Sequence, residues 1–78
     1  MTLKIISTTE ILFEGEVNMV TLPGAKGRFT VLHNHAALVS TLVAGDIVFR
    51  NATGQETTYT VSGGIANVDN NVISVCIY

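Results

Sequence analysis

The stretch QETTYTV, residues 55–61, alternates between two kinds of side chain. Thr57, Tyr59 and Val61 fall on one side of an extended chain, and charged or hydroxyl side chains fall on the other. A period of two residues is typical of a β-strand with one face in a core and the other in water. We therefore expect a strand at 56–61 in a sheet that has one solvated face.

A second stretch, VISVCIY at residues 72–78, is apolar on both faces. Val72 and Cys76 share one face, and Ile73, Val75 and Ile77 share the other. Such a strand is either central between two layers or covered by another protein. The sequence leaves both explanations open.

Turn residues divide the rest of the chain into similar short pieces rich in Val, Ile and Thr, which is typical of an all-β sandwich or barrel. The stretch HAALVSTLVA, residues 35–44, also suits a short helix, but its length and flanking turns favour a strand. We expect turns at 23–27, 44–46, 51–54 and 69–71. The predicted strands are 3–7, 10–13, 16–22, 28–32, 37–42, 47–50, 56–61, 64–68 and 72–77.

With 78 residues, the chain is expected to form one domain, residues 1–78, with no second domain. Its 47% hydrophobic content fills a core and suggests an apolar outer face that meets a partner. Four basic against six acidic residues disfavour nucleic-acid binding. The first ten residues lack the pattern of a signal peptide, and no run approaches the roughly 20 apolar residues of a membrane span, so a soluble cytoplasmic chain is expected. The lone Cys76 is interpreted as a small strand residue, not a reactive thiol.

The segment TLPGAKGRFTVLHNHAALVSTL, residues 21–42, holds the only proline and both histidines. Its Gly24-Ala25-Lys26-Gly27 lacks the spacing of a phosphate loop, and no helix follows to bind an anion, so a five-residue hairpin connection at 23–27 is favoured. His33 and His35 do not make a metal site by themselves, because zinc takes about three or four protein ligands. The other candidate ligands are scattered along the chain.

Catalytic constellations are equally poorly supported. Ser62-Gly63-Gly64 is interpreted as a tight turn, because a nucleophile elbow needs Gly before the Ser. Glu14-Gly15-Glu16 is interpreted as a solvated hairpin end and not as a carboxylate pair. No nucleophile, base and orienting group come together, so we expect neither an enzyme nor a cofactor.

Five short motifs in order nevertheless resemble those of the epsilon subunit of F-type ATP synthases, in its N-terminal β domain, over essentially the whole chain. They are Phe13-Glu14-Gly15-Glu16-Val17, Thr21-Leu22-Pro23-Gly24, Gly27-Arg28-Phe29-Thr30-Val31-Leu32, His35-Ala36-Ala37-Leu38 and Val61-Ser62-Gly63-Gly64. The resemblance implies a flattened β-sandwich or barrel of about ten strands. It also implies a non-catalytic rotor subunit of the central stalk, linking the gamma subunit to the c-ring and coupling ion (proton) translocation to ATP synthesis. Such a subunit is peripheral to the cytoplasmic face of the cell membrane.

The resemblance also implies two contact surfaces and no metal, cofactor or small-molecule ligand. Residues expected to face the polar loops of the c-ring are Lys26, Gly27, Arg28, Phe29, His33 and His35. Residues suggested for the gamma contact are Val39, Leu42, Ser62, Gly63 and Gly64. An equal alternative is that the apolar residues near the gamma set merely complete the core.

This chain departs from the family pattern at four positions within residues 28–37 and at its C-terminal end. Thr30, His33 and Ala37 stand where relatives frequently have Gly, Pro and Pro, and Arg28 stands where an acidic residue is common. The sign of the charge opposite Arg28 is therefore open. Typical members also continue into a C-terminal helical hairpin that inhibits ATP hydrolysis, whereas this sequence ends at Tyr78, so we expect assembly without inhibition by that arm.

The competing interpretation is a free-standing small β-barrel that binds oligonucleotides or proteins. An oligonucleotide barrel needs a basic groove and aromatic stacking platforms. The available rings are Phe13, Phe29, Phe49, Tyr59 and Tyr78, without a basic stripe. A metal enzyme built on the two histidines ranks third.

Overall fold

Nine β-strands and no helix make up the computed structural model, which describes all of residues 1–78. Since the structure has no helix, it also has no apolar helix of membrane-spanning length. The all-β prediction is confirmed. The strands are β1 (Thr2–Ile6), β2 (Ile11–Glu16), β3 (Met19–Gly24), β4 (Gly27–Leu32), β5 (Leu38–Leu42), β6 (Gly45–Arg50), β7 (Glu56–Val61), β8 (Gly64–Asp69) and β9 (Val72–Ile77).

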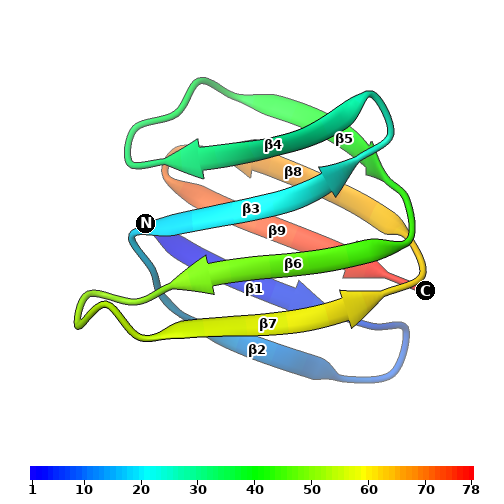
Figure 1. The fold of residues 1–78 in the computed structure, drawn as a ribbon, viewed down its shortest axis with the longest axis horizontal. Helices are drawn as coiled ribbons and strands as arrows, with labels where there is room; N and C mark the ends of the chain where they lie inside the picture. Colours follow the sequence, from blue (N-terminus) through cyan, green and yellow to red (C-terminus); the bar gives the residue numbers. More distant parts are fainter.

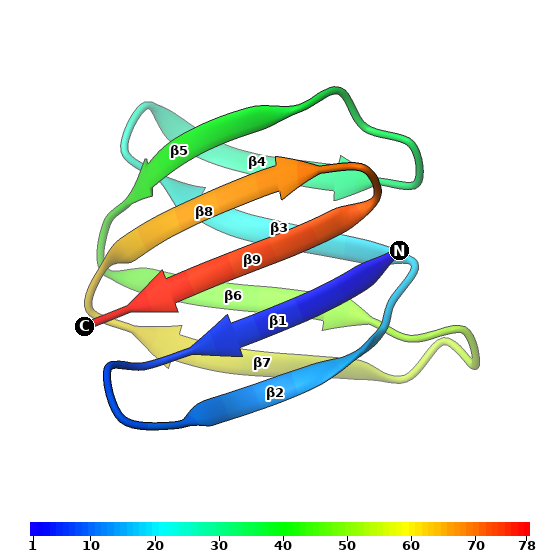
Figure 2. The same ribbon diagram turned by 180° about the vertical axis from the view of Figure 1, so that it is seen from behind.

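The strands form two facing layers (Figures 1 and 2). One layer has the order β2-β1-β9-β8-β5, and the other has the order β4-β3-β6-β7. A single pairing between Gly24 and Leu42 joins β3 to β5 and makes the two layers one curled sheet. The first and last strands, β1 and β9, form the only parallel pair, and all other pairs are antiparallel. Both ends of the chain are thereby held in the middle of one layer.

The core lies between the layers and is formed by the alternate side chains of each strand that point inward. In β9, Ile73 and Val75 are fully buried while Val72 and Cys76 are exposed on the outer face. In β7, Tyr59 and Val61 turn inward as the period of two residues predicts. The buried hydrophobic residues are Met1, Leu3, Ile5, Val17, Val20, Leu22, Val31, Leu42, Ile47, Phe49, Val61, Ala66, Val68, Ile73 and Val75.

The two open sides of the sandwich are filled differently. Between β2 and β7, the rings of Phe13 and Phe49 lie 4.4 Å apart, and Tyr59 stacks on Phe49 at 6.1 Å. The Tyr59 hydroxyl donates to the Leu12 carbonyl at 3.2 Å and ties the two layers together there. On the opposite side, between β4 and β5, no such ring cluster closes the gap, and this side carries the candidate site.

Two sequence-based boundaries are wrong. Glu14-Gly15-Glu16 is not a hairpin end but the last half of β2, which pairs with β1, and the chain crosses to the other layer only after it, at Val17 and Asn18. Pro23 and Gly24 belong to β3, so the connection to β4 is Ala25 and Lys26 alone and not five residues. The other predicted strands lie within a few residues of those in the structure.

Candidate functional site

A tight hairpin between β3 and β4 presents Lys26 and Arg28 to solvent. Gly24 pairs with Gly27, and a Cβ on Gly24 would approach the Gly27 carbonyl oxygen to 2.6 Å and the Phe29 ring to 2.8 Å. Gly27 itself has φ 128°, a conformation that favours glycine. The two glycines therefore shape a compact turn, which explains the glycine spacing without a phosphate.

The hairpin is fixed to β5 of the other layer. The Ala25 amide donates to the Thr41 carbonyl and the Val43 amide donates to the Pro23 carbonyl, both at 2.9 Å. These bonds lie beside the Gly24–Leu42 pairing that joins the layers. The β3–β4 turn that carries Lys26 therefore has a defined position relative to β5.

The residues expected at the c-ring lie along one side of the molecule but not at one point. Lys26 lies in the turn before β4, and Gly27, Arg28 and Phe29 begin the strand, whereas His33 and His35 belong to the loop at its far end. A strand of 6 residues spans roughly 17–20 Å. A partner that meets both groups must therefore lie along the β4 side and not on a single loop tip.

The His33–Ala37 loop is held in place by Asn71 from the β8–β9 turn. The Asn34 amide donates to Asn71 Oδ1 at 2.7 Å, and Asn71 Nδ2 donates to Asn34 Oδ1 at 3.1 Å. Asn71 Nδ2 also lies 3.4 Å from Nδ1 of His33. Asn34 and Asn71 have positive φ angles of 61° and 62°, which Asn tolerates better than most residues. The sequence identified a turn at 69–71 but gave no sign that it anchors the histidine loop.

The structure does not bring the candidate histidines and carboxylates together as a metal site. His35 Nδ1 lies 2.7 Å from the Ala36 carbonyl oxygen, and His33 is beside Asn71. No group of three or more His, Cys, Asp or Glu side chains has the proximity to hold a metal ion. Glu14 and Glu16 have separate partners, with Glu14 3.8 Å from Lys4 Nζ and Glu16 3.3 Å from the amino group of Met1.

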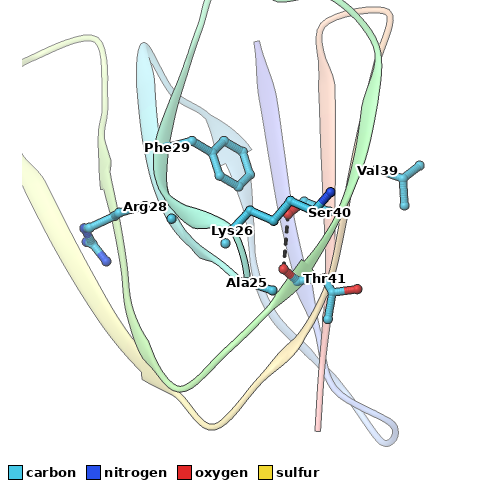
Figure 3. A pocket seen from close by; sticks show the side chains of 9 residues that line it. Ala25, Lys26, Arg28, Phe29, Val39, Ser40 and Thr41 are labelled. Atoms are coloured by element: carbon cyan, nitrogen blue, oxygen red, sulfur yellow. Dashed lines mark hydrogen bonds between the residues drawn. The ribbon is translucent and has the colours of Figure 1, made fainter.

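A groove of about 540 Å³ runs between β4 and β5 next to the hairpin. Its lining residues are Gly24, Ala25, Lys26, Gly27, Arg28, Phe29, Val39, Ser40 and Thr41. Figure 3 shows the Lys26 side chain extending across the groove toward Ser40, while Arg28 points away on the other side of β4. The groove thus combines backbone and hydroxyl groups with one ring and the Lys26 ammonium group, while the Arg28 guanidinium lies on the other side of β4.

A second exposed feature is an apolar row on the outer face of the other layer. The row consists of Ile6, Ile11, Ile65 and Cys76, which are neighbours across the strands β2, β1, β9 and β8. Ile11 is 60% exposed and Ile65 is 52% exposed. Sequence reasoning did not assign Ile6, Ile11 or Cys76 to any surface, although the two-sided apolar pattern of 72–77 was the available signal.

Comparison with known protein families identifies the family of the chain. Residues 1–77 match the family described as "ATP synthase, Delta/Epsilon chain, beta-sandwich domain". The chain belongs to the ATP synthase delta/epsilon family. This confirms the resemblance of the five sequence motifs and the β-sandwich that it implied.

Individual family members agree over most of the chain. The ATP synthase epsilon chain of Rickettsia typhi is 39% identical over 74 residues, covering 92% of this chain and 67% of that protein. The epsilon chain of Sulfurovum sp. is 42% identical over 69 residues, covering 88% of this chain and 54% of that protein. The chain thus spans about half to two thirds of the length of these relatives.

A solved ATP synthase structure contains a chain of the same fold and related sequence. In the Euglena gracilis mitochondrial ATP synthase, OSCP/F1/c-ring, one chain superposes with TM-score 0.90 at 26% identity, covering 96% of this chain and 48% of that one. A chain in the Tetrahymena thermophila mitochondrial ATP synthase central stalk/c-ring superposes with TM-score 0.82 at 11% identity, which supports the fold alone.

Within this family member, the residues suggested for the gamma contact differ in accessibility. Val39 is 71% exposed on β5, and Ser62 is exposed in the β7–β8 turn. Gly63 and Gly64 are buried, and Gly63 lies under the Tyr78 ring. Leu42 is only 2% exposed and packs in the core, so its side chain offers no surface to a partner. Leu42 is therefore part of the core, whereas Ile65, next to Gly64 on β8, is exposed to solvent.

Proposed function

We propose that this chain is a non-catalytic rotor subunit in the central stalk of an F-type ATP synthase. In this role it links the gamma subunit to the c-ring and thereby couples ion translocation to ATP synthesis. Family membership over residues 1–77 is the observation that carries the proposal. The subunit would then be peripheral to the cytoplasmic face of the membrane, held there through the c-ring.

Two separate surfaces suit a linking subunit. The β4 side, with its hairpin, groove and histidine loop, is polar and charged, as expected for a contact with exposed polar loops. We assign this side to the c-ring. The apolar row on the outer face of β2-β1-β9-β8 suits a long-lived subunit contact, because such interfaces are more hydrophobic than transient ones. We assign the apolar row, with Ser62, to gamma, and Val39 lies between the two surfaces because it also lines the groove.

The oligonucleotide-binding alternative is weakened by the positions of the aromatic rings. Phe13, Phe49 and Tyr59 pack against one another between the layers and are not available as stacking platforms. Only Phe29, partly buried, and Tyr78 remain near the surface. A single-strand binder needs several exposed rings along a basic groove.

Co-purification tests the proposal. A tagged copy of the chain, expressed in its own organism, should bring down gamma and the c-ring in stoichiometric amounts after gentle detergent extraction, as seen by native mass spectrometry. The 78 residues alone should not inhibit ATP hydrolysis by the enzyme, because they contain no helical arm. Recovery of the chain as a monomer that binds single-stranded DNA with steep salt dependence would contradict the proposal.

A further inference from the structure

The basic side chains of this protein fall into two classes. Of the four, Lys4 is 3.8 Å from Glu14 Oε2 and Arg50 Nη2 is 3.1 Å from Glu56 Oε2. Lys26 and Arg28 have no carboxylate within 4.0 Å and are exposed. Both unpaired cations therefore lie on the same hairpin, within three residues of each other.

The carboxylates of the chain lie elsewhere. Glu14, Glu16 and Glu56 are engaged in ion pairs, and Asp46 accepts a hydrogen bond from the Thr60 hydroxyl at 2.8 Å. The other two acidic residues are Glu10, which precedes β2, and Asp69, which ends β8. No acidic residue lines the groove between β4 and β5. A protein of formal net charge −2 thus has a locally positive groove. A positively charged site on a protein of net negative charge helps to fix the orientation in which a partner binds.

The groove also offers backbone N–H and C=O groups that are not paired with another strand. β4 pairs only with β3, so its outer edge is free, and β5 pairs with β8 along its length but with β3 only at Leu42. An unpaired strand edge can accept an extended segment of another chain. The Lys26 side chain lies over this opening (Figure 3).

We propose that the free edge of β4, at the groove between β4 and β5, receives a carboxylate-bearing polypeptide segment of the partner, which pairs with Lys26 in the groove and with Arg28 on the opposite side of β4. This rests on the proposed function, under which the segment is a polar loop of the c-ring, and it assigns that loop a negative charge opposite Arg28. A phosphate group fits less well, because Lys26 and Arg28 point to opposite sides of β4 and no helix N-terminus adds donors. A loop with separated carboxylates reaches both cations.

Neutralising the two cations tests the proposal. The double variant Lys26→Gln/Arg28→Gln is compared with Ala52→Glu/Thr58→Glu, which changes the net charge equally but on and beside β7, at the far edge of the same layer. Binding is measured to the detergent-solubilised gamma–c-ring subcomplex of the same organism and to gamma alone, over a range of salt concentrations. Neither pair of residues contributes to the core, and circular dichroism confirms folding.

The neutralised variant should bind the gamma–c-ring subcomplex about tenfold more weakly, with a shallower salt dependence, while its affinity for gamma alone stays unchanged. The β7 control should stay within about twofold of wild type. Equal binding of wild type and the neutralised variant would overturn the charge assignment and leave the rotor function intact. Failure of wild type to bind the subcomplex would overturn the function itself. Binding of wild type to phosphatidylglycerol vesicles, lost in the neutralised variant, would replace the protein loop by a lipid headgroup.

Discussion

Gly64 shows how closely two strands approach at the start of β8. A Cβ at this position would collide with the backbone carbonyl of Cys76 on β9, which a side-chain rotation cannot relieve. At Gly15 the nearest atom is instead the tip of the Phe13 ring, at 3.1 Å, which has more freedom to move. The family motif Val61-Ser62-Gly63-Gly64 thus has a packing explanation in addition to any role in binding.

Gly64→Ala should lower the free energy of unfolding by about 3 kcal/mol, because the backbone of β8 or β9 must shift to accommodate the methyl group. Gly15→Ala is the matched control and should cost less than about 1 kcal/mol. Urea denaturation of both variants measures the difference. Equal stability of the two alanine variants would show that the close approach of β8 and β9 does not determine the cost of an added methyl group at Gly64.

Glu16 has a lowered pKa. The main cause is the hydrogen bond that its carboxylate accepts from the Thr2 hydroxyl at 2.8 Å, followed by the bond and charge of the Met1 amino group. Because the folded-state pKa lies below the unfolded value, the ionised carboxylate stabilises the fold at pH values above the unfolded pKa, about 4.3. That contribution is lost as the pH falls through the folded-state pKa.

Glu16→Gln should therefore be less stable than wild type at pH 7 and approach wild-type stability as the pH falls below about 4. Glu10→Gln is the control, since the Glu10 side chain has no hydrogen bond or ion pair in the structure. Urea unfolding at a series of pH values measures both. A stability difference for Glu16→Gln that persists unchanged at pH 2.5 would rule out this linkage.

The loop between β4 and β5 depends on the turn between β8 and β9. Asn70 and Asn71 both have positive φ, but only Asn71 uses its side chain to hold Asn34. Glycine keeps the backbone conformation at either position. Substituting glycine at each position in turn therefore distinguishes the effect of the turn conformation from the effect of the Asn71 side-chain hydrogen bonds.

Asn71→Gly should destabilise the protein by about 1 kcal/mol and speed hydrogen exchange at the Asn34 amide, because that amide loses its acceptor. Asn70→Gly should leave both unchanged. Hydrogen exchange followed by NMR reports the Asn34 amide directly. Slow exchange at Asn34 in the Asn71→Gly variant would mean that another group holds the loop.

The strands themselves were largely predictable, for a physical reason. In 56–61 and 72–77 the alternation of side chains is the same pattern that buries one face, so both strands have the predicted bounds. The third strand was misplaced because Gly15 and the Pro23-Gly24 pair resemble turns. Pro23 is tolerated within β3 because pairing with β6 ends at Thr21, so no ladder bond to β6 is needed there.

The candidate surfaces were less predictable, because they depend on which strands become neighbours. Ile6, Ile65 and Cys76 come from three parts of the sequence and meet only through the pairing of β1 with β9 and of β8 with β9. The link between Asn71 and Asn34 likewise joins residues 37 positions apart. Alternation within one strand indicates which face is buried but not which strands lie side by side.

Taken as a whole, the molecule has one polar side and one apolar row, on different strands. The single cysteine, Cys76, lies in the apolar row and is exposed. The rate at which its thiol is alkylated therefore shows whether a partner covers that face. Binding of gamma should slow alkylation of Cys76 by about tenfold or more, as expected for a residue buried in a stable interface. A Cys76→Ala/Thr58→Cys variant, with the thiol moved to β7, should react equally fast with and without gamma.

Under the proposed function, the polar β4 side and the apolar row meet two different subunits of the rotor. A photo-crosslinking amino acid placed singly at Arg28, Ile65 or Thr58 in the assembled enzyme tests this assignment, with mass spectrometry identifying the partner. We predict crosslinks from position 28 to the c-ring, from position 65 to gamma, and from position 58 to neither. Crosslinks from positions 28 and 65 to the same subunit, or to no rotor subunit, would contradict the assignment of the two surfaces.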